Sequence, residues 1–245
     1  MQTEVPKDNV GVDIHEDEGP AFEGFSNKNV RLGFIRKVYM ILAVQLVFSA
    51  FLVWLSVYNE PYRQFLQQNT FILIIAAVLS IVLIYALMCY QSIARKVPHN
   101  FILLGVFTVC EAYLVSAITL GADPQLVLIA AILTAGIVVS LTIYAITTKT
   151  DFTMMGGILF MLLVTLILAS FLGFFIRSKG FEIFISSCSV VVFGLYLIYD
   201  TQLIVGGKRR ELSVDDYIIG ALMLYIDIIQ IFLEILRILS IATNN

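Results

Sequence analysis

Seven apolar stretches, each about as long as a membrane-crossing helix, constrain the fold of this chain more than any other feature. A helix that spans the hydrocarbon core of a bilayer needs about 20 apolar residues, and it satisfies its own backbone hydrogen bonds in lipid. All five prolines lie outside the stretches, so we expect unbroken helices. The predicted fold is an all-α integral membrane protein, a bundle of seven transmembrane helices. The spans are 38–57, 71–90, 101–120, 126–146, 154–176, 183–206 and 217–242.

The composition agrees with a membrane location. Of the 245 residues, 60% are hydrophobic and 13% charged, and the mean hydropathy is +0.94. Soluble domains are about 45–50% apolar and about 25% charged. Acidic residues dominate only in residues 1–29, where we predict a disordered tail without the pattern of a secretory signal. One transmembrane domain is predicted to follow over residues 30–245.

Basic residues are divided unequally between the two sides of the predicted bundle. Ten lie on the side of the N-terminus and four on the other, so the positive-inside rule predicts a cytosolic N-terminus. The last stretch itself contains Asp227, Glu234 and Arg237, which leaves open both a full crossing and a re-entrant turn. The ten are Lys28, Arg31, Arg36, Lys37, Arg95, Lys96, Lys149, Lys208, Arg209 and Arg210, and the four are Arg63, Arg177, Lys179 and Arg237.

Four acidic residues lie inside the apolar stretches: Glu111, Asp200, Asp227 and Glu234. A charged group near the bilayer centre costs at least about 2.5–3.5 kcal/mol on insertion scales. Each of these acids therefore marks a candidate functional site on an ion or proton route. The alternative is that each hydrogen-bonds a neighbouring helix and fixes the packing.

Asp200 and Asp227 end two similar motifs, LYLIYD and LMLYID, on either side of the turn at 207–216. Because each helical residue rises 1.5 Å, the two aspartates of this hairpin are expected to lie level with each other. Two carboxyl groups in a poorly hydrated site cannot both ionise freely, so they titrate as a coupled unit. A shared proton would hold the helices together, and double ionisation would push them apart. The pattern predicts a proton-sensitive latch whose oxygens also suit Ca²⁺.

Four segments, 30–45, 107–115, 141–157 and 197–239, resemble the transmembrane Bax-inhibitor-motif family, also called the lifeguard family. The chain is most like its Golgi anti-apoptotic protein branch. YDTQ, a basic turn, DDY and LYIDIIQIFLEILR follow one another at the family's spacing. The resemblance implies a seven-helix protein of Golgi or endoplasmic reticulum membranes that leaks Ca²⁺ in a pH-sensitive way and suppresses apoptosis. It implies no cofactor or tightly bound metal, with calcium as the permeant ion.

The resemblance also implies roles for single residues. Asp200 and Asp227 match the family's proton-sensing pair. Bacterial relatives add an arginine at the end of the second helix, which has no clean match here, and Arg95 is the nearest candidate for a gating partner. Asp215 and Asp216 match an acidic position on the ion route, although acids also favour a helix N-terminus on general grounds.

Secondary residues complete the predicted site. Glu111, which is shared with the Golgi branch, and Glu234 are candidates to attract cations along the route. The basic turn at 208–210 is expected to anchor on anionic lipid. The predicted partners are the lipid bilayer, calcium, and apoptosis regulators or calcium-release channels; no nucleic acid is expected.

Three other functions remain open. Buried carboxyl groups also suit a proton-coupled exchanger, and the acidic tail would suit a non-conducting regulator of partner proteins. An intramembrane aspartyl protease is disfavoured because its second motif reads GxGD where this chain has LYID. No histidine lies in a span and the three cysteines are scattered, so we expect no enzyme built on those side chains.

Overall fold

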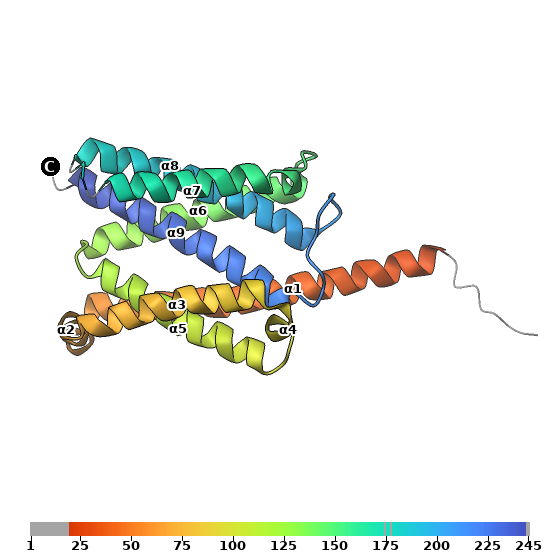
Figure 1. The fold of residues 1–245 in the computed structure, drawn as a ribbon, viewed down its shortest axis with the longest axis horizontal. Helices are drawn as coiled ribbons and strands as arrows, with labels where there is room; N and C mark the ends of the chain where they lie inside the picture. The colour runs from red at the N-terminus through yellow and green to blue at the C-terminus, as the bar shows by residue number, and fades with distance from the viewer. Residues whose placement is uncertain (1–19, 174, 177, 244–245) are drawn as a thin grey trace, which may run out of the picture.

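The computed structural model describes residues 20–173, 175–176 and 178–243, which form an all-helical bundle without strands (Figure 1). Six helices are long and apolar enough to cross a membrane, and the shorter α7 is a seventh apolar helix. The predicted all-α membrane bundle is therefore confirmed. The elements are α1 (Pro20–Tyr58), α2 (Glu60–Gln68), α3 (Thr70–Cys89), α4 (Gln91–Ala94), α5 (His99–Thr119), α6 (Pro124–Thr147), η1 (Phe152–Met154), α7 (Gly156–Leu172), α8 (Lys179–Val205) and α9 (Tyr217–Thr243).

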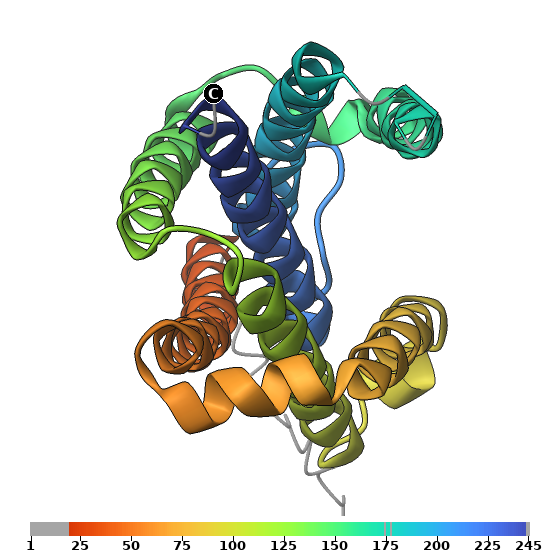
Figure 2. The same ribbon diagram turned by 90° about the vertical axis from the view of Figure 1, so that its left-hand side faces the viewer.

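The central element of the bundle is α9. It packs against α1, α5, α6 and α8, and Figure 2 shows it running through the middle of the assembly. Within its membrane-length window 61% of the residues are buried, against 17–39% in the other spans. Polar side chains on α9 are therefore shielded from lipid by its neighbours, which is what allows this helix to contain acids.

Each predicted span coincides with a helix of the structure, and the bounds differ most at α1, which is described below, and at α7. This helix begins at Gly156 and has 17 residues, whereas the sequence predicted a span over 154–176. Its expected start is taken up by η1, where Asp151 Oδ1 accepts hydrogen bonds from the backbone N–H and the hydroxyl of Thr153. The last span is one continuous helix of 27 residues, so the re-entrant alternative is not observed.

The first helix begins earlier than predicted. It starts at Pro20, so residues 20–29, which the sequence assigned to the disordered tail, are helical. Proline is favoured in the first turn of a helix because its missing N–H has no intrahelical partner there. Residues 1–19 of the predicted tail lie outside the described residues. In Figure 1 the N-terminal part of α1 extends beyond the rest of the bundle.

The two ends of the bundle differ in their loops (Figure 1). One end of the bundle is formed by residues 90–98, 147–155 and 206–216, and we call it the hairpin end. The carboxyl end is formed by α2, the turn at 120–123 and the last turn of α9. Helix α2 begins with a side-chain cap, because Asn59 accepts a hydrogen bond from the backbone N–H of Tyr62 at 3.0 Å.

Candidate functional site

The candidate site is the pair formed by Asp200 of α8 and Asp227 of α9. Their exposed fractions are 3% and 4%, and their carboxyl groups lie within hydrogen-bonding reach of each other. An ionised carboxylate only accepts hydrogen bonds, so a bond between two carboxyl groups requires that one of them be protonated. Two further oxygens, Asp200 Oδ1 and Asp227 Oδ2, are buried without a hydrogen-bond partner. The geometry brings the two predicted aspartates together in the interior of the bundle.

Uncharged groups surround the pair. The Tyr196 hydroxyl, one turn before Asp200 on α8, lies in the electrostatic field of both aspartates. Thr201 follows Asp200, and its hydroxyl and that of Tyr39 on α1 are buried without a hydrogen-bond partner. Among the described residues, the only charged group that acts on either aspartate is the other aspartate. No described cationic side chain therefore balances the charge that the pair would carry if both acids were ionised.

The predicted partner Arg95 lies elsewhere. Its Nε donates a hydrogen bond to Asp216 Oδ1 at 2.7 Å, and its Nη2 donates one to Asp216 Oδ2 at 2.9 Å. This hydrogen bond raises the pKa of Arg95 above its usual value, and the charge of Asp216 adds to the effect. Asp216 precedes Asp227 by 11 residues, so the ion pair lies about 16 Å along the helix axis from the acid pair. The candidate gating partner Arg95 therefore pairs with Asp216 rather than with the acid pair, and it ties the α4 loop to the start of α9.

The two acids before α9 differ in their surroundings. Asp215 is exposed, whereas Asp216 is buried and its carbonyl accepts the first hydrogen bond of α9, from the N–H of Gly220 at 2.9 Å. Asp216 is therefore placed to stabilise the N-terminus of α9 as well as to bind Arg95.

A buried glutamine closes the hairpin end beside the pair. Gln202, which is 2% exposed, accepts a hydrogen bond from the N–H of Phe152 at 2.8 Å. Its amide nitrogen donates to the carbonyls of Ala145 and Thr150 at 3.2 and 3.0 Å. One side chain of α8 thus satisfies one backbone group in the last turn of α6 and two in the segment between α6 and α7.

The basic turn after α8 is fastened to the same loop. Lys208 Nζ lies 3.1–3.3 Å from the carbonyls of residues 148–150, and the N–H of Arg209 donates to Asp151 Oδ2 at 3.2 Å. The hydrogen bond from the Thr153 hydroxyl lowers the pKa of Asp151, with smaller contributions from backbone N–H groups and Lys208. The predicted lipid anchor is therefore partly engaged in contacts within the protein.

Arg31 of α1 closes the remaining side of the hairpin end. Its guanidinium donates to the carbonyls of Leu203, Val205 and Leu212 at 2.7, 3.3 and 2.6 Å. It points inward because it shares a helix face with Phe34 and Val38, which are both buried. Helix α1 thereby holds the end of α8 and the loop that leads to α9.

The carboxyl end is hollow by comparison. A cavity of about 350 Å³ between α7, α8 and α9 is lined by Ser189, Gln230 and Glu234. A second cavity of about 400 Å³ beside the α5–α6 turn shares Gln230 and Glu234 and adds Arg237. Glu234 Oε2 is buried without a hydrogen-bond partner. The predicted polar face of α9 thus lies between two cavities and reaches to within one turn of Asp227.

Glu111 occupies a different part of the bundle. It is partly buried on α5, within hydrogen-bonding reach of Ser80 on α3, and its charge acts on Tyr225 of α9. These contacts tie α5 to α3 and favour the packing interpretation of Glu111 over a direct role in the acid pair.

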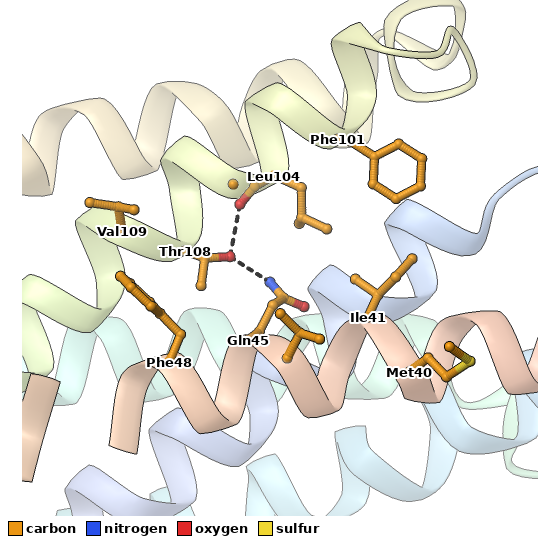
Figure 3. A pocket seen from close by; sticks show the side chains of 10 residues that line it. Met40, Ile41, Gln45, Phe48, Phe101, Leu104, Thr108 and Val109 are labelled. Atoms are coloured by element: carbon orange, nitrogen blue, oxygen red, sulfur yellow. Dashed lines mark hydrogen bonds between the residues drawn. The ribbon is translucent and has the colours of Figure 1, made fainter. Parts of the chain in front are cut away.

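An apolar cavity of about 490 Å³ lies between α1 and α5 (Figure 3). Inside it, Gln45 Nε2 donates to the Thr108 hydroxyl at 2.8 Å, and this hydroxyl donates to the carbonyl of Leu104 at 2.8 Å. No acidic or basic side chain is among its lining residues in the described part of the chain. This cavity therefore gives no support to an ion route.

Membrane-length helices around a buried central helix, with a buried acid pair inside, define a polytopic helical membrane protein with an internal acid site. The family model "Inhibitor of apoptosis-promoting Bax1" matches residues 31–244. The chain therefore belongs to the Bax inhibitor family, which includes the lifeguard proteins, and the resemblance seen in the sequence motifs is confirmed.

Similar proteins agree with this assignment. Protein lifeguard 3 of Homo sapiens is 34% identical over 220 residues, which cover 88% of this chain and 71% of the relative. Protein lifeguard 4 of Mus musculus is 35% identical and the Golgi anti-apoptotic protein of Vaccinia virus (strain Lister) is 31% identical, each over 217 residues. These two alignments cover 89% of this chain and 88% and 89% of the relatives.

Sequence reasoning missed the residues that close the hairpin end. Gln202 and Arg31 bind backbone carbonyls and N–H groups, and such partners leave no pattern in the sequence. A signal did exist for Arg31, because it precedes two buried apolar residues at spacings of three and seven. A basic residue on the apolar face of a helix is expected to point inward.

Proposed function

We propose that this protein is a pH-sensitive calcium leak channel of an intracellular membrane, with Asp200 and Asp227 as its proton sensor. The observation that carries the proposal is the contact between two buried carboxyl groups from neighbouring helices. Such a contact depends on one proton, so its loss is the simplest way for pH to change the packing of α8 against α9.

The sign of the pH effect follows from the charges. While the pair shares a proton, the two helices are held together. When rising pH removes that proton, two negative charges at hydrogen-bonding distance repel each other, and flux should rise. Tyr196 on α8 is a titratable neighbour of the pair, and tyrosine side chains are ordinarily neutral around pH 7.

The shape of the bundle supports a route with one closed end. Gln230 and Glu234 line cavities that approach the pair from the carboxyl end, and carboxylate and amide oxygens are ligands that Ca²⁺ accepts. The hairpin end carries most of the basic residues, so we place it in the cytosol. Calcium would then enter from the store and meet the closed hairpin end last.

The cellular role follows from the relatives. The names of the family and of the viral relative refer to inhibition of apoptosis. We propose that this protein suppresses apoptosis by lowering store calcium. The Golgi is the favoured location because that relative is named for it, with the endoplasmic reticulum as the alternative.

The test is calcium flux through the purified full-length protein in liposomes over a pH series. The wild-type protein should show flux that rises with pH through a midpoint. The double variant Asp200→Asn with Asp227→Asn should lose the pH dependence, because neither side chain can then ionise. A double variant with the wild-type pH profile would contradict the proposal.

Glu111→Gln is the matched control, because it neutralises an intramembrane acid whose neighbours are Ser80 and Tyr225. It should leave the pH midpoint of calcium flux in place, and a shifted midpoint would mean that Glu111 is coupled to the acid pair. Proton counter-flux in fixed proportion to calcium would instead identify an exchanger.

A further inference from the structure

Several backbone oxygens converge at the end of α8. The carbonyls of Leu203, Val205 and Leu212 all accept hydrogen bonds from the single guanidinium of Arg31, at 2.7, 3.3 and 2.6 Å. We call these three carbonyls, together with the nearby Glu211 carboxylate, the oxygen cage. It holds one cationic group supplied by a different helix.

Local backbone geometry explains why the oxygens face one point. The last carbonyls of a helix have no amide one turn further on, and they carry the negative end of the helix dipole. Gly206 then turns the chain at a φ of 75°, and the N–H of Leu212 returns to bind the carbonyl of Leu203 at 2.9 Å. The loop therefore folds back over the helix end and adds its own carbonyl to the cage.

The cage also carries negative charge. The Glu211 carboxylate is held beside it by the N–H of Gly207 at 3.1 Å, and its charge acts on Arg31. A Cβ built on Gly206 would lie 2.5 Å from Glu211 Oε2 and 2.8 Å from the guanidinium carbon of Arg31. Glycine at this position is what allows the carboxylate and the guanidinium to approach the same point.

Backbone carbonyls and a carboxylate are the oxygen ligands that Ca²⁺ takes in proteins. The guanidinium group of Arg31 has only hydrogen-bond donors and stays charged at any physiological pH. It therefore acts as a permanent positive charge held at the cage by its own side chain. We propose that the oxygen cage is a divalent-cation site at the hairpin end and that Arg31 closes it by occupying it. Leu203 lies three residues beyond Asp200, so an ion leaving the acid pair toward this end would meet the cage next.

The test of binding uses Tb³⁺ as a luminescent stand-in for Ca²⁺, excited through the tyrosines of the full-length protein in detergent. Arg31→Ala should gain one Tb³⁺ site at least tenfold tighter than any site in the wild-type protein, and Ca²⁺ should compete for it. Adding Glu211→Gln should weaken that site again. Arg36→Ala is the matched control, because Arg36 is an exposed arginine of the same helix.

The outcomes separate the cage from other sites. An Arg31→Ala protein that binds Tb³⁺ no better than the wild type would overturn the proposal. So would a new site that is insensitive to Glu211→Gln, because it would then lie elsewhere. Arg31→Gln keeps two N–H donors for the carbonyls and tests the same point if the alanine variant does not fold. Should neither fold, competition between Arg31 and the ion should still leave a weak site in the wild-type protein at millimolar Tb³⁺. Glu211→Gln must weaken that site, and unchanged binding would contradict the cage.

The functional meaning of the cage rests on the proposed calcium leak, and flux distinguishes the two ideas. Arg31→Gln in liposomes should raise calcium flux several-fold at a fixed pH and leave the pH midpoint in place. A wild-type protein without flux would defeat the proposed function, while Tb³⁺ binding would still decide the cage. Binding at the cage without a rise in flux would overturn only the claim that Arg31 closes the route.

Discussion

The hairpin end and the carboxyl end of this bundle are built from the same kinds of residue but are closed to different degrees. At the hairpin end, Gln202, Lys208 and Arg31 connect three elements through backbone hydrogen bonds. At the carboxyl end, Gln230 and Glu234 line two cavities, and Arg237 lies 3.5 Å from Glu182. The comparison shows that polar side chains close an end of this bundle only where backbone N–H and carbonyl groups are placed to form hydrogen bonds with them.

The largest expected effect on stability distinguishes Gln202 at the hairpin end from Gln230 at the carboxyl end. Gln202→Leu keeps the side-chain volume but leaves the N–H of Phe152 and two carbonyls without their partner. We expect a loss of about 3 kcal/mol in unfolding free energy, since each unsatisfied buried group costs about 1–3 kcal/mol. Gln230→Leu should cost less than about 1 kcal/mol, because Gln230 lines cavities. Denaturant unfolding in detergent measures both, and equal losses would remove the distinction between the ends.

A smaller effect is expected from two adjacent glycines. Gly206 and Gly207 both have a φ of 75°, but an added Cβ would meet Arg31 and Glu211 only at Gly206. Gly206→Ala should cost about 2 kcal/mol or more, and Gly207→Ala about 1 kcal/mol from backbone strain alone.

Hydrogen exchange of residues 206–216 reports whether the cage opens in these variants. It should become faster in Gly206→Ala than in Gly207→Ala. If exchange is equally fast in the two variants, the close packing of the cage does not contribute to the stability of this loop.

The smallest expected difference in stability is between variants of the ion pairs at the two ends. Arg95 contacts Asp216 through two hydrogen bonds, and the Asp216 side chain is 8% exposed. Arg237 and Glu182 form a single longer contact with side chains 48% and 36% exposed. Arg95→Gln should therefore lower the melting temperature clearly, because it leaves a buried carboxylate alone, whereas Arg237→Gln should have little effect.

A double variant sharpens the comparison of ion pairs. Asp216→Asn added to Arg95→Gln should recover part of the loss, because the unpaired charge is then gone. No recovery would mean that Arg95 acts through contacts other than Asp216.

The sequence allowed the bundle and the acid pair to be predicted but not their closure. Span boundaries follow from runs of apolar residues, and Asp200 meets Asp227 because a hairpin of two regular helices places them level. The family's arginine position has no clean match in this sequence, so the pairing of Arg95 with Asp216 could not be predicted from it. The roles of Gln202 and Arg31 depend on how loops fold back on helix ends, which tertiary packing decides.

The short α7 has a consequence for the surrounding lipid. Its 17 residues span about 26 Å, while a typical hydrocarbon core is about 30 Å thick. A helix shorter than the membrane is accommodated by local thinning of the bilayer. Ser170 and Phe171, at the last turn of α7, line the cavity that reaches Glu234. The membrane itself would thus bring headgroups and water closer to this opening, and the thickness of the host bilayer would tune access to the interior.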